Sequence, residues 1–274
     1  MNTDQLLITT EQLREIHEQP DVALLDVRYS LDSRQEGYDL FANGHIPGAT
    51  YLHWLDDWSD PEDPVEGQLA RPEQFAAAMR QAGVHNTTRV IAYDDAELFM
   101  AARMVWALNH YGHSSAQVLD GGLPKWIADG GRIETGPGTP APEGTFSVPT
   151  TRSAARLTKD DVWALVSDGG GPLLDCRMDR TWDETGQHIP GASRLPSPSL
   201  VRDDGTLRSA EEIRSILHTQ GVTEDVPITL YCGGGVSAAQ GWLAMRAAGF
   251  TNVGVYDGSW SEWSADANTP KASH

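Results

Sequence analysis

Cysteine is scarce in this sequence. The 274 residues include two cysteines, Cys176 and Cys232, and they form no C-x-x-C pair. This pattern excludes a disulfide framework and a cysteine zinc site. A low cysteine count is typical of a reducing compartment, in which a thiol stays free.

Positive charge and long apolar runs are also lacking. The chain has 20 Lys and Arg against 39 Asp and Glu, a formal net charge of −19, which argues against nucleic acid or an anionic membrane surface as a partner. No run approaches the length of a membrane span, and residues 1–7 lack the basic start and the apolar stretch of a secretion signal. We therefore expect a cytoplasmic protein without a membrane partner, in which an anionic substrate is attracted by a local cationic pocket.

The two halves of the sequence repeat one another. The first half contains LLDVR (24–28), GHIPGA (44–49), VIAYD (90–94) and VLDGG (118–122), and the second contains LLDCR (173–177), QHIPGA (187–192), ITLYC (228–232) and VYDGS (255–259). The offset changes only from 149 residues (24 to 173) to 137 residues (118 to 255). Such self-similarity indicates a duplicated domain of about 130 residues.

Each copy alternates short apolar runs with helical stretches. This alternation predicts an α/β fold in which each domain has a mostly parallel sheet flanked by helices on both faces. Residues 135–150 are rich in Pro and Gly and have no apolar pattern, so they predict a linker between domains 1–134 and 151–274. Capping pairs mark three helix starts: Thr9 with Gln12, Thr158 with Asp161, and Ser209 with Glu212.

The most informative stretch is YCGGGVSA, residues 231–238. An apolar run before it predicts a buried strand and the residues after it predict a helix, so that Cys232 ends a strand and faces a helix N-terminus. Glycines let the backbone turn its N–H groups inward as an anion-binding nest, and charge-assisted hydrogen bonds of about 1.5–3 kcal/mol each would stabilise a thiolate. We predict that Cys232 is a catalytic nucleophile. The residues predicted to hold its anion are Gly233, Gly234, Gly235, Val236, Ser237 and Ala238.

The first half lacks this loop. Asp94 stands at the position of the cysteine, and the three glycines have no counterpart. We therefore predict that the N-terminal domain is non-catalytic. Arg28 and Arg177 each follow an aspartate by two residues in both halves, which indicates structural ion pairs, and Cys176 is predicted to be a buried, inert thiol.

These segments together resemble the tandem-domain rhodanese family, which contains the thiosulfate and 3-mercaptopyruvate sulfurtransferases. The resemblance spans nearly the whole chain and includes both HIPGA segments, the CGGGVSA loop and the closing YDGSWSEW (256–263). It implies two rhodanese-like domains and a ping-pong reaction without cofactor or metal. The Cys232 thiolate would take a sulfur atom from a donor as a persulfide, and cyanide, a thiol or thioredoxin would remove it.

The resemblance also bears on the sulfur donor. Members that favour thiosulfate usually carry Arg-Lys after the cysteine, whereas those that favour mercaptopyruvate carry an uncharged Gly-Ser-Gly-Val-Thr. The uncharged loop of this chain favours 3-mercaptopyruvate, with thiosulfate as the alternative. Two departures from the mercaptopyruvate lineage are Gly234, where it has a serine, and Gly67, roughly where it has a histidine. The Pro-Glu-Pro-Arg stretch that usually precedes the second His-Ile-Pro-Gly segment in that lineage is missing from this chain.

Four further residues are candidates for the site. Arg180 falls near the family's carboxylate- or sulfonate-binding arginine, and a guanidinium suits such an oxyanion through a bidentate contact; the alternative is a surface arginine. Asp56 matches an aspartate of the mercaptopyruvate lineage. His53 and Trp54 are candidates for the cleft, with an aromatic cluster at the core edge as the alternative.

Two other functions have partly similar sequence patterns. A phosphatase of the Cys-x5-Arg type needs an arginine where this chain has Ala238, which argues against that class. A persulfide carrier or binding module that does not turn over would have the same sequence, and it stays open.

Overall fold

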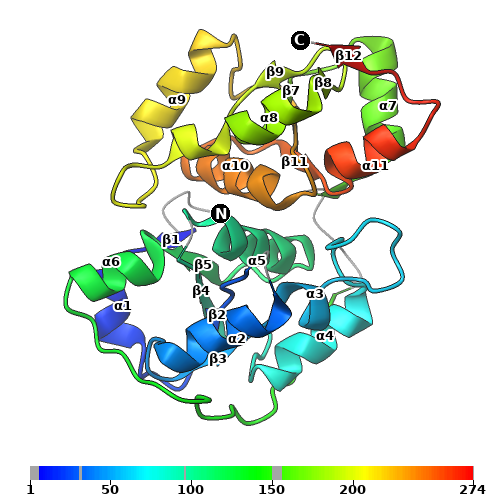
Figure 1. The fold of residues 1–274 in the computed structure, drawn as a ribbon. Coiled ribbons are helices and arrows are strands. Elements are labelled where there is room, and N and C mark those ends of the chain that lie inside the picture. Colours follow the sequence, from blue (N-terminus) through cyan, green and yellow to red (C-terminus); the bar gives the residue numbers. More distant parts are fainter. Residues whose placement is uncertain (1–5, 31–32, 96, 150–155, 274) are drawn as a thin grey trace. The chain divides into compact units, whose positions relative to one another are not determined.

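The structure is a computed structural model that describes residues 6–30, 33–95, 97–149 and 156–273 (Figure 1). The chain divides into two compact units, Met1–Arg152 with Asp203–Thr206 and Ser153–Arg202 with Leu207–His274. We call them the first and the second unit. Each contains its own five-stranded sheet.

The first unit alternates strands and helices along the sequence. Its elements are β1 (Leu7–Ile8), α1 (Thr10–Ile16), β2 (Val22–Asp26), α2 (Arg34–Asn43), β3 (Ala49–Tyr51), α3 (Trp54–Asp57), α4 (Pro72–Gln81), β4 (Arg89–Tyr93), α5 (Phe99–His110), β5 (Ala116–Leu119) and α6 (Gly122–Ala128).

The second unit repeats that order with a few additions. Its elements are β6 (Arg156–Leu157), α7 (Lys159–Asp168), β7 (Leu173–Asp175), α8 (Asp179–Thr185), β8 (Gln187–His188), β9 (Ser193–Arg194), the 3-10 helix η2 (Ser197–Leu200), α9 (Ala210–Thr219), β10 (Ile228–Tyr231), α10 (Val236–Ala247), β11 (Val253–Tyr256), α11 (Ser259–Ala265) and β12 (Ala272–Ser273).

The two large sheets have the same topology. Their strand orders are β1-β5-β4-β2-β3 and β6-β11-β10-β7-β9, and the described pairs within them are parallel. The register sets Asp26 opposite Tyr93 in the first sheet and Asp175 opposite Tyr231 in the second. The predicted fold, a parallel sheet flanked by helices in each of two domains, is confirmed.

Helices bury both faces of each sheet (Figure 1). In the first unit, side chains of α1, α2 and α6 share one core cluster with the strands, while α5, which is buried along nearly its whole length, covers the other face. In the second unit, α7 and α11 contribute to one cluster. Because both faces are covered, the central strands β4 and β10 are buried at nearly every residue rather than at alternate residues.

The capping and ion-pair predictions are confirmed. Helices α1, α7 and α9 each begin with a complete capping box. The Arg28 Nη2 atom lies 2.7 Å from Asp26 Oδ2, and the Arg177 Nη2 atom lies 2.6 Å from Asp175 Oδ2, in both cases with all partners buried. These two pairs hold equivalent strand ends in both units, so their role is structural.

Residues 135–149 have no helix or strand. The segment is nevertheless attached to the first unit, because the Phe146 side chain is buried and its N–H donates to Val84 O at 3.1 Å.

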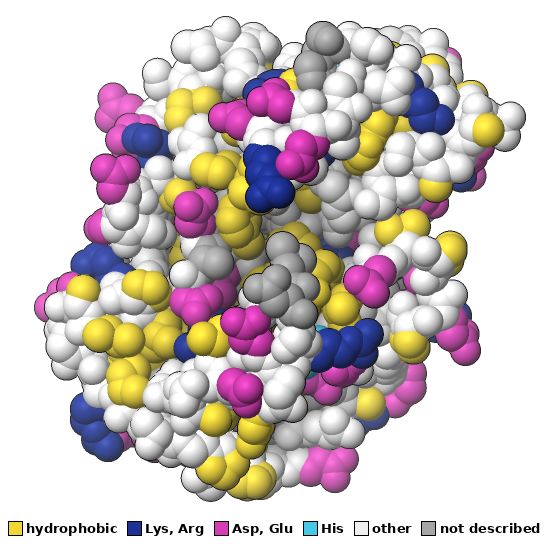
Figure 2. Space-filling view, in the orientation of Figure 1, with side chains coloured by type: hydrophobic (Ala, Val, Ile, Leu, Met, Phe, Trp, Pro, Cys, Tyr) yellow, Lys and Arg dark blue, Asp and Glu magenta, His cyan; other side chains and the backbone are white. Residues whose placement is uncertain are grey.

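Among the described helices, none combines the length and the apolar character that a bilayer span requires. Acidic side chains are spread over both units with basic side chains between them on the face in Figure 2.

Candidate active site

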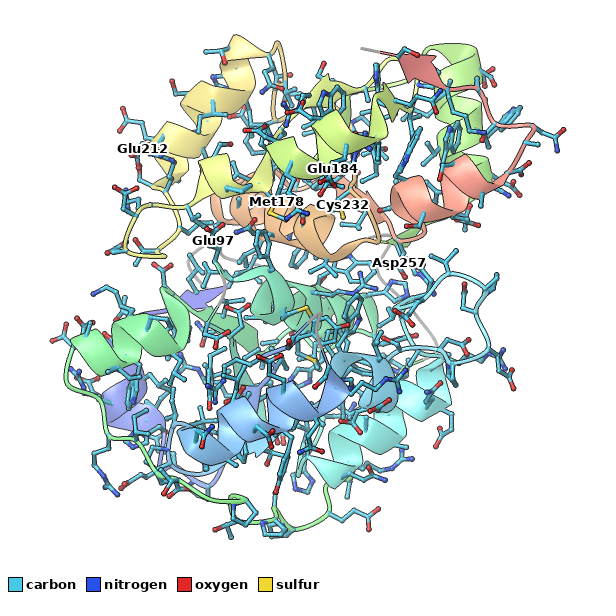
Figure 3. All side chains as sticks on the ribbon, in the orientation of Figure 1. Glu97, Met178, Glu184, Glu212, Cys232 and Asp257 are labelled. Carbon is cyan, nitrogen blue, oxygen red and sulfur yellow. The ribbon has the colours of Figure 1, made fainter. Side chains whose placement is uncertain are left out.

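Cys232 lies where β10 ends and just before α10 begins (Figure 3). Its side chain is 2% exposed, and its Sγ atom accepts a hydrogen bond from the Gly235 N–H at 3.1 Å. Within the described residues, this is the donor that meets hydrogen-bond geometry to the sulfur. The sulfur therefore lies at the N-terminus of α10 and not in purely apolar packing.

The first turn of α10 offers further N–H groups. The first four N–H groups of a helix have no carbonyl partner within it, and the earliest bond recorded for α10 runs from Ala239 N to Gly235 O. The amides of Val236, Ser237 and Ala238 precede it. Together with the helix dipole they form an environment that stabilises an anion.

The three glycines have different roles in this loop. Gly235 has a left-handed φ of 86° and is the residue before α10, a conformation that favours glycine. Gly233 and Gly234 do not share it. A Cβ atom added to either would meet nothing within 4 Å, so neither backbone conformation nor space requires glycine at these two positions.

The start of α11 fixes the backbone of the same loop. Ser259 Oγ accepts from the Cys232 N–H at 3.1 Å, and the Trp260 N–H donates to Cys232 O at 2.9 Å. The Ser261 N–H and Oγ both donate to Gly233 O, at 2.9 and 2.8 Å. These contacts were not predicted, although the repeat offers one signal, since Ser259 stands where the first unit has Gly122.

The second cysteine is close to the first but lies in a different environment. Because Asp175 is opposite Tyr231 on adjacent strands, Cys176 follows beside Cys232. Its side chain is completely buried, and a Cβ atom added to Gly241 of α10 would lie 2.9 Å from its sulfur. Burial, together with the nearby Cys232 and Asp175, raises the pKa of the Cys176 thiol well above its ordinary value. The prediction of an inert, buried Cys176 agrees with this environment.

Asp94 occupies the corresponding loop of the first unit, and its carboxylate accepts hydrogen bonds at the start of α5. It is buried, and it accepts hydrogen bonds from the N–H groups of Leu98, Met100 and Ala101 at 3.2, 2.8 and 2.9 Å. Its carbonyl accepts from the Leu123 N–H at 2.8 Å, just as the Cys232 carbonyl accepts from Trp260. The two loops are therefore built alike, but the first holds a carboxylate.

The remaining candidates of the first unit gather around α3. His53 is the residue before α3 and is buried, and its Nδ1 atom accepts from the Asp56 N–H at 3.3 Å. Trp54 packs edge-on against Tyr29, with ring centroids 5.0 Å apart. Asp56 is half exposed and forms an ion pair with Arg34. His53 and Trp54 thus lie in an aromatic cluster, and a role of these two residues and of Asp56 in a cleft stays a prediction.

Arg180 lies in the first turn of α8, which follows β7. Its side chain is 87% exposed, and its Nε atom donates to Glu184 Oε1 at 2.9 Å. It is a surface residue with an intrahelical partner, which agrees with the alternative for this residue, and its role in binding a substrate stays a prediction. In the described part of the chain, no group of three or more His, Cys, Asp or Glu side chains is arranged to hold a metal ion.

Sequence comparison assigns the family. The profile described as "Rhodanese-like domain" matches residues 9–129 and again residues 158–266. The chain belongs to the rhodanese family. Both matches fall on the repeated segments, one in each unit, so the resemblance noted in the sequence is confirmed.

Relatives with printed activities cover the chain almost end to end. The 3-mercaptopyruvate sulfurtransferase of Escherichia coli is 34% identical over 96% of both chains, and the crystal structure of SseA from Escherichia coli, with a TM-score of 0.83, covers 94% of this chain and 99% of that one. The putative thiosulfate sulfurtransferase SseB of Mycobacterium tuberculosis is 34% identical over 97% of this chain and 96% of its own. The sulfur carrier protein TtuD of Thermus thermophilus is 32% identical over 98% of this chain and 96% of its own. This rhodanese-family chain is a sulfurtransferase, as predicted.

Proposed function

We propose that the protein transfers sulfur from 3-mercaptopyruvate to a thiophilic acceptor through a persulfide on Cys232. The observation that carries this proposal is the position of the Cys232 sulfur, 3.1 Å from the Gly235 N–H at the start of α10. A sulfur nucleophile must be an anion to attack, and the backbone amides and the helix dipole stabilise one there.

The chemistry proceeds in two displacement steps. In the first, the Cys232 thiolate attacks the thiol sulfur of 3-mercaptopyruvate, an S–S bond forms, and the bond between that sulfur and carbon breaks. The electron pair of the broken bond and the thiol proton go to the carbon, which becomes the methyl group of pyruvate. In the second, the acceptor attacks the outer sulfur of the persulfide and releases the Cys232 thiolate. Both the thiolate and the persulfide are anions, so the same N–H groups serve both states.

The uncharged loop supports the choice of donor. Gly233, Gly234 and Gly235 contribute no cation next to the sulfur, whereas a doubly anionic donor such as thiosulfate would be favoured by one. The Escherichia coli relative named for 3-mercaptopyruvate agrees with this choice. The relative named for thiosulfate keeps thiosulfate as the alternative donor.

Arg180 is proposed to attract the donor carboxylate. It lies on α8, which follows the carboxyl end of β7, and β7 is paired with β10, the strand that leads to Cys232. An exposed ion pair such as that with Glu184 is weak, so a carboxylate can exchange with Glu184. If Arg180 has this role, Arg180→Gln will raise KM for 3-mercaptopyruvate more than kcat falls, and Glu184→Gln, the matched control, will not raise KM.

The alternative function is that of a persulfide carrier. TtuD, which is 32% identical to this chain, is named a sulfur carrier protein. A carrier would accept one sulfur atom and keep it until a specific partner protein removed it. Repeated transfer to cyanide, a small thiol or thioredoxin would instead support an enzyme.

The proposed compartment is a reducing one such as the cytoplasm. It would keep both cysteines free, as they are in the structure.

The test is turnover with the two donors. Purified protein receives 3-mercaptopyruvate or thiosulfate with cyanide, and thiocyanate is measured continuously to give kcat/KM for each donor. We expect many turnovers per protein molecule and a higher kcat/KM for 3-mercaptopyruvate. Mass spectrometry after treatment with donor alone should show the gain of one sulfur atom on Cys232.

Each part of the proposal has its own contrary result. A preference for thiosulfate of more than about ten-fold would reverse the order of the donors. A single sulfur atom transferred per molecule, with no turnover by small acceptors, would favour the carrier. Cys232→Ser should abolish transfer and Cys176→Ala should retain it, and loss in the second variant alone would overturn the site.

A further inference from the structure

Ser259 has a backbone conformation that residues other than glycine seldom adopt. Its φ is 52°, in the left-handed region. The repeat aligns Ser259 with Gly122 of the first unit, which has a φ of 58°. The second unit therefore keeps the left-handed backbone but has a side chain there. Local strain of this kind persists where the surrounding structure requires it, and it concentrates at functional sites.

The hydroxyl of Ser259 has two well-defined partners. It donates its one proton to Tyr256 O at 2.8 Å, so the oxygen is an acceptor toward Cys232, whose N–H lies 3.1 Å away. The side chain is completely buried. With the Trp260 N–H on the Cys232 carbonyl, two consecutive residues of α11 hold both backbone polar groups of Cys232.

The first unit shows which of these contacts belongs to the fold and which was added. Leu123 N–H donates to Asp94 O in the same way as Trp260 N–H donates to Cys232 O, so this contact is common to both units. Gly122 has no hydroxyl, and a Cβ atom built there would overlap the Asp94 carbonyl oxygen. The serine hydroxyl that accepts from the loop backbone is thus specific to the unit that has the cysteine.

We propose that Ser259 is a positioning residue for sulfur transfer. Its hydroxyl fixes the Cys232 backbone so that Sγ stays beside the Gly235 N–H and the start of α10 while the residue passes between thiolate and persulfide. Ser259 acts through Cys232 and touches neither donor nor acceptor. This role of Ser259 rests on the proposed function of Cys232.

Two substitutions separate positioning from simple stabilisation. Ser259→Gly and Ser259→Ala both remove the hydroxyl, but only glycine relieves the left-handed conformation. A merely structural role predicts that activity follows stability, so that the glycine variant reacts like the wild type and the alanine variant reacts poorly. A positioning role predicts that both variants lose reactivity to a similar extent although the alanine variant melts at a lower temperature.

The measurements are the alkylation rate of Cys232 by iodoacetamide, the kinetics of sulfur transfer and Tm. We expect both variants to be alkylated more slowly and to lose kcat by about ten-fold or more, since a small misplacement of a reacting group has effects of this size. KM for the donor should change by less than about two-fold because the hydroxyl does not contact it. Ser259→Gly reacting at the wild-type rate, or rates that follow Tm, would overturn the proposal.

Thr269→Ala is the matched control. Thr269 is also buried, and its hydroxyl lies within hydrogen-bond distance of the Trp263 and Asp266 carbonyl oxygens, at the end of α11 far from Cys232. This variant should lower Tm and leave the alkylation rate of Cys232 unchanged; slower alkylation would mean that any destabilisation of α11 has the same effect. Alkylation needs no sulfur donor, so it tests Ser259 even if the wild type transfers no sulfur, a result that would refute the proposed function alone.

Discussion

The Asp94 loop and the Cys232 loop are two versions of one structure. Each follows the central strand of a parallel sheet and leads into a long buried helix. In the first unit, the N–H groups of Leu98, Met100 and Ala101 donate to the buried carboxylate of Asp94. In the second, the Gly235 N–H donates to the thiol sulfur of Cys232. The first N–H groups of α10 have no carbonyl partner within the helix.

This difference teaches that the anion-binding geometry comes from the fold, whereas the chemistry comes from the atom placed in it. A carboxylate there satisfies the amides permanently and stabilises its unit. A sulfur in the same place can attack a donor and carry an added atom. The first unit therefore keeps the architecture of the site but has filled it with its own side chain.

The most severe way to break the difference is Cys232→Asp, which gives the second loop the side chain of the first. We expect sulfur transfer to fall by at least about 10³-fold because the nucleophile is lost. The protein should still fold, since the carboxylate can accept from the N–H groups of α10 as Asp94 does from those of α5. Thiocyanate formation and calorimetry measure the two effects, and an unfolded variant would show that the loops are not equivalent.

The reverse experiment removes the anion from the first unit. Asp94→Ala would leave three buried N–H groups without their acceptor, so we expect the free energy of unfolding of this unit to fall by about 3 kcal/mol. Denaturant titration followed by tryptophan fluorescence measures the loss. Asp94→Asn keeps one acceptor oxygen and should recover part of the stability; equal stability of the alanine variant and the wild type would contradict the assigned role.

A smaller effect tests whether the second loop needs its third glycine. Gly235→Ala places a side chain at a φ of 86°, which costs about 1–2 kcal/mol, and it should lower kcat/KM because the N–H that contacts the sulfur moves. Leu98 is the residue before α5 and adopts a φ of 68° without glycine, so the unit should still fold. Gly234→Ala is the control for stability, since its added Cβ meets nothing within 4 Å.

The smallest expected effect concerns the helices α4 and α9, which occupy the same place in the order of elements, directly before β4 and β10. Helix α4 has no side-chain cap, whereas α9 begins with the Ser209–Glu212 capping box. Hydrogen bonds from Ser209 lower the pKa of Glu212 from 4.5 to about 2. Ionised Glu212 therefore stabilises the second unit above pH 4.5, and this stabilisation is lost as the pH falls toward about 2.

Glu212→Ala sharpens this contrast. The variant should melt a few degrees below the wild type at neutral pH, and the difference should shrink as the pH falls from 4.5 to about 2. Calorimetry across that range measures it. A difference that stays constant down to the lowest pH would show that the carboxylate charge of Glu212 contributes nothing.

Several features could be predicted from the sequence because they depend on local patterns. The capping boxes, the Asp-x-Arg pairs and the strand–loop–helix at Cys232 each lie within a few residues, and the Asp-x-Arg pair occurs once in each half. The surroundings of Arg180 and His53 could not be predicted from local patterns. Whether such a side chain faces a substrate or a neighbour depends on packing, and in the structure Arg180 contacts Glu184 while His53 belongs to an aromatic cluster.

The sequence by itself determined the duplicated α/β fold, the order of its segments and the cysteine at the strand end, because hydrophobic periodicity and turn residues act over short distances. Only the tertiary structure decided what surrounds that cysteine. Ser259 is 27 residues from Cys232 along the chain, and Cys176 becomes its neighbour only through strand pairing. Contacts of this kind form when the sheet is assembled, since the register and the burial that create them belong to the folded domain and not to any one segment.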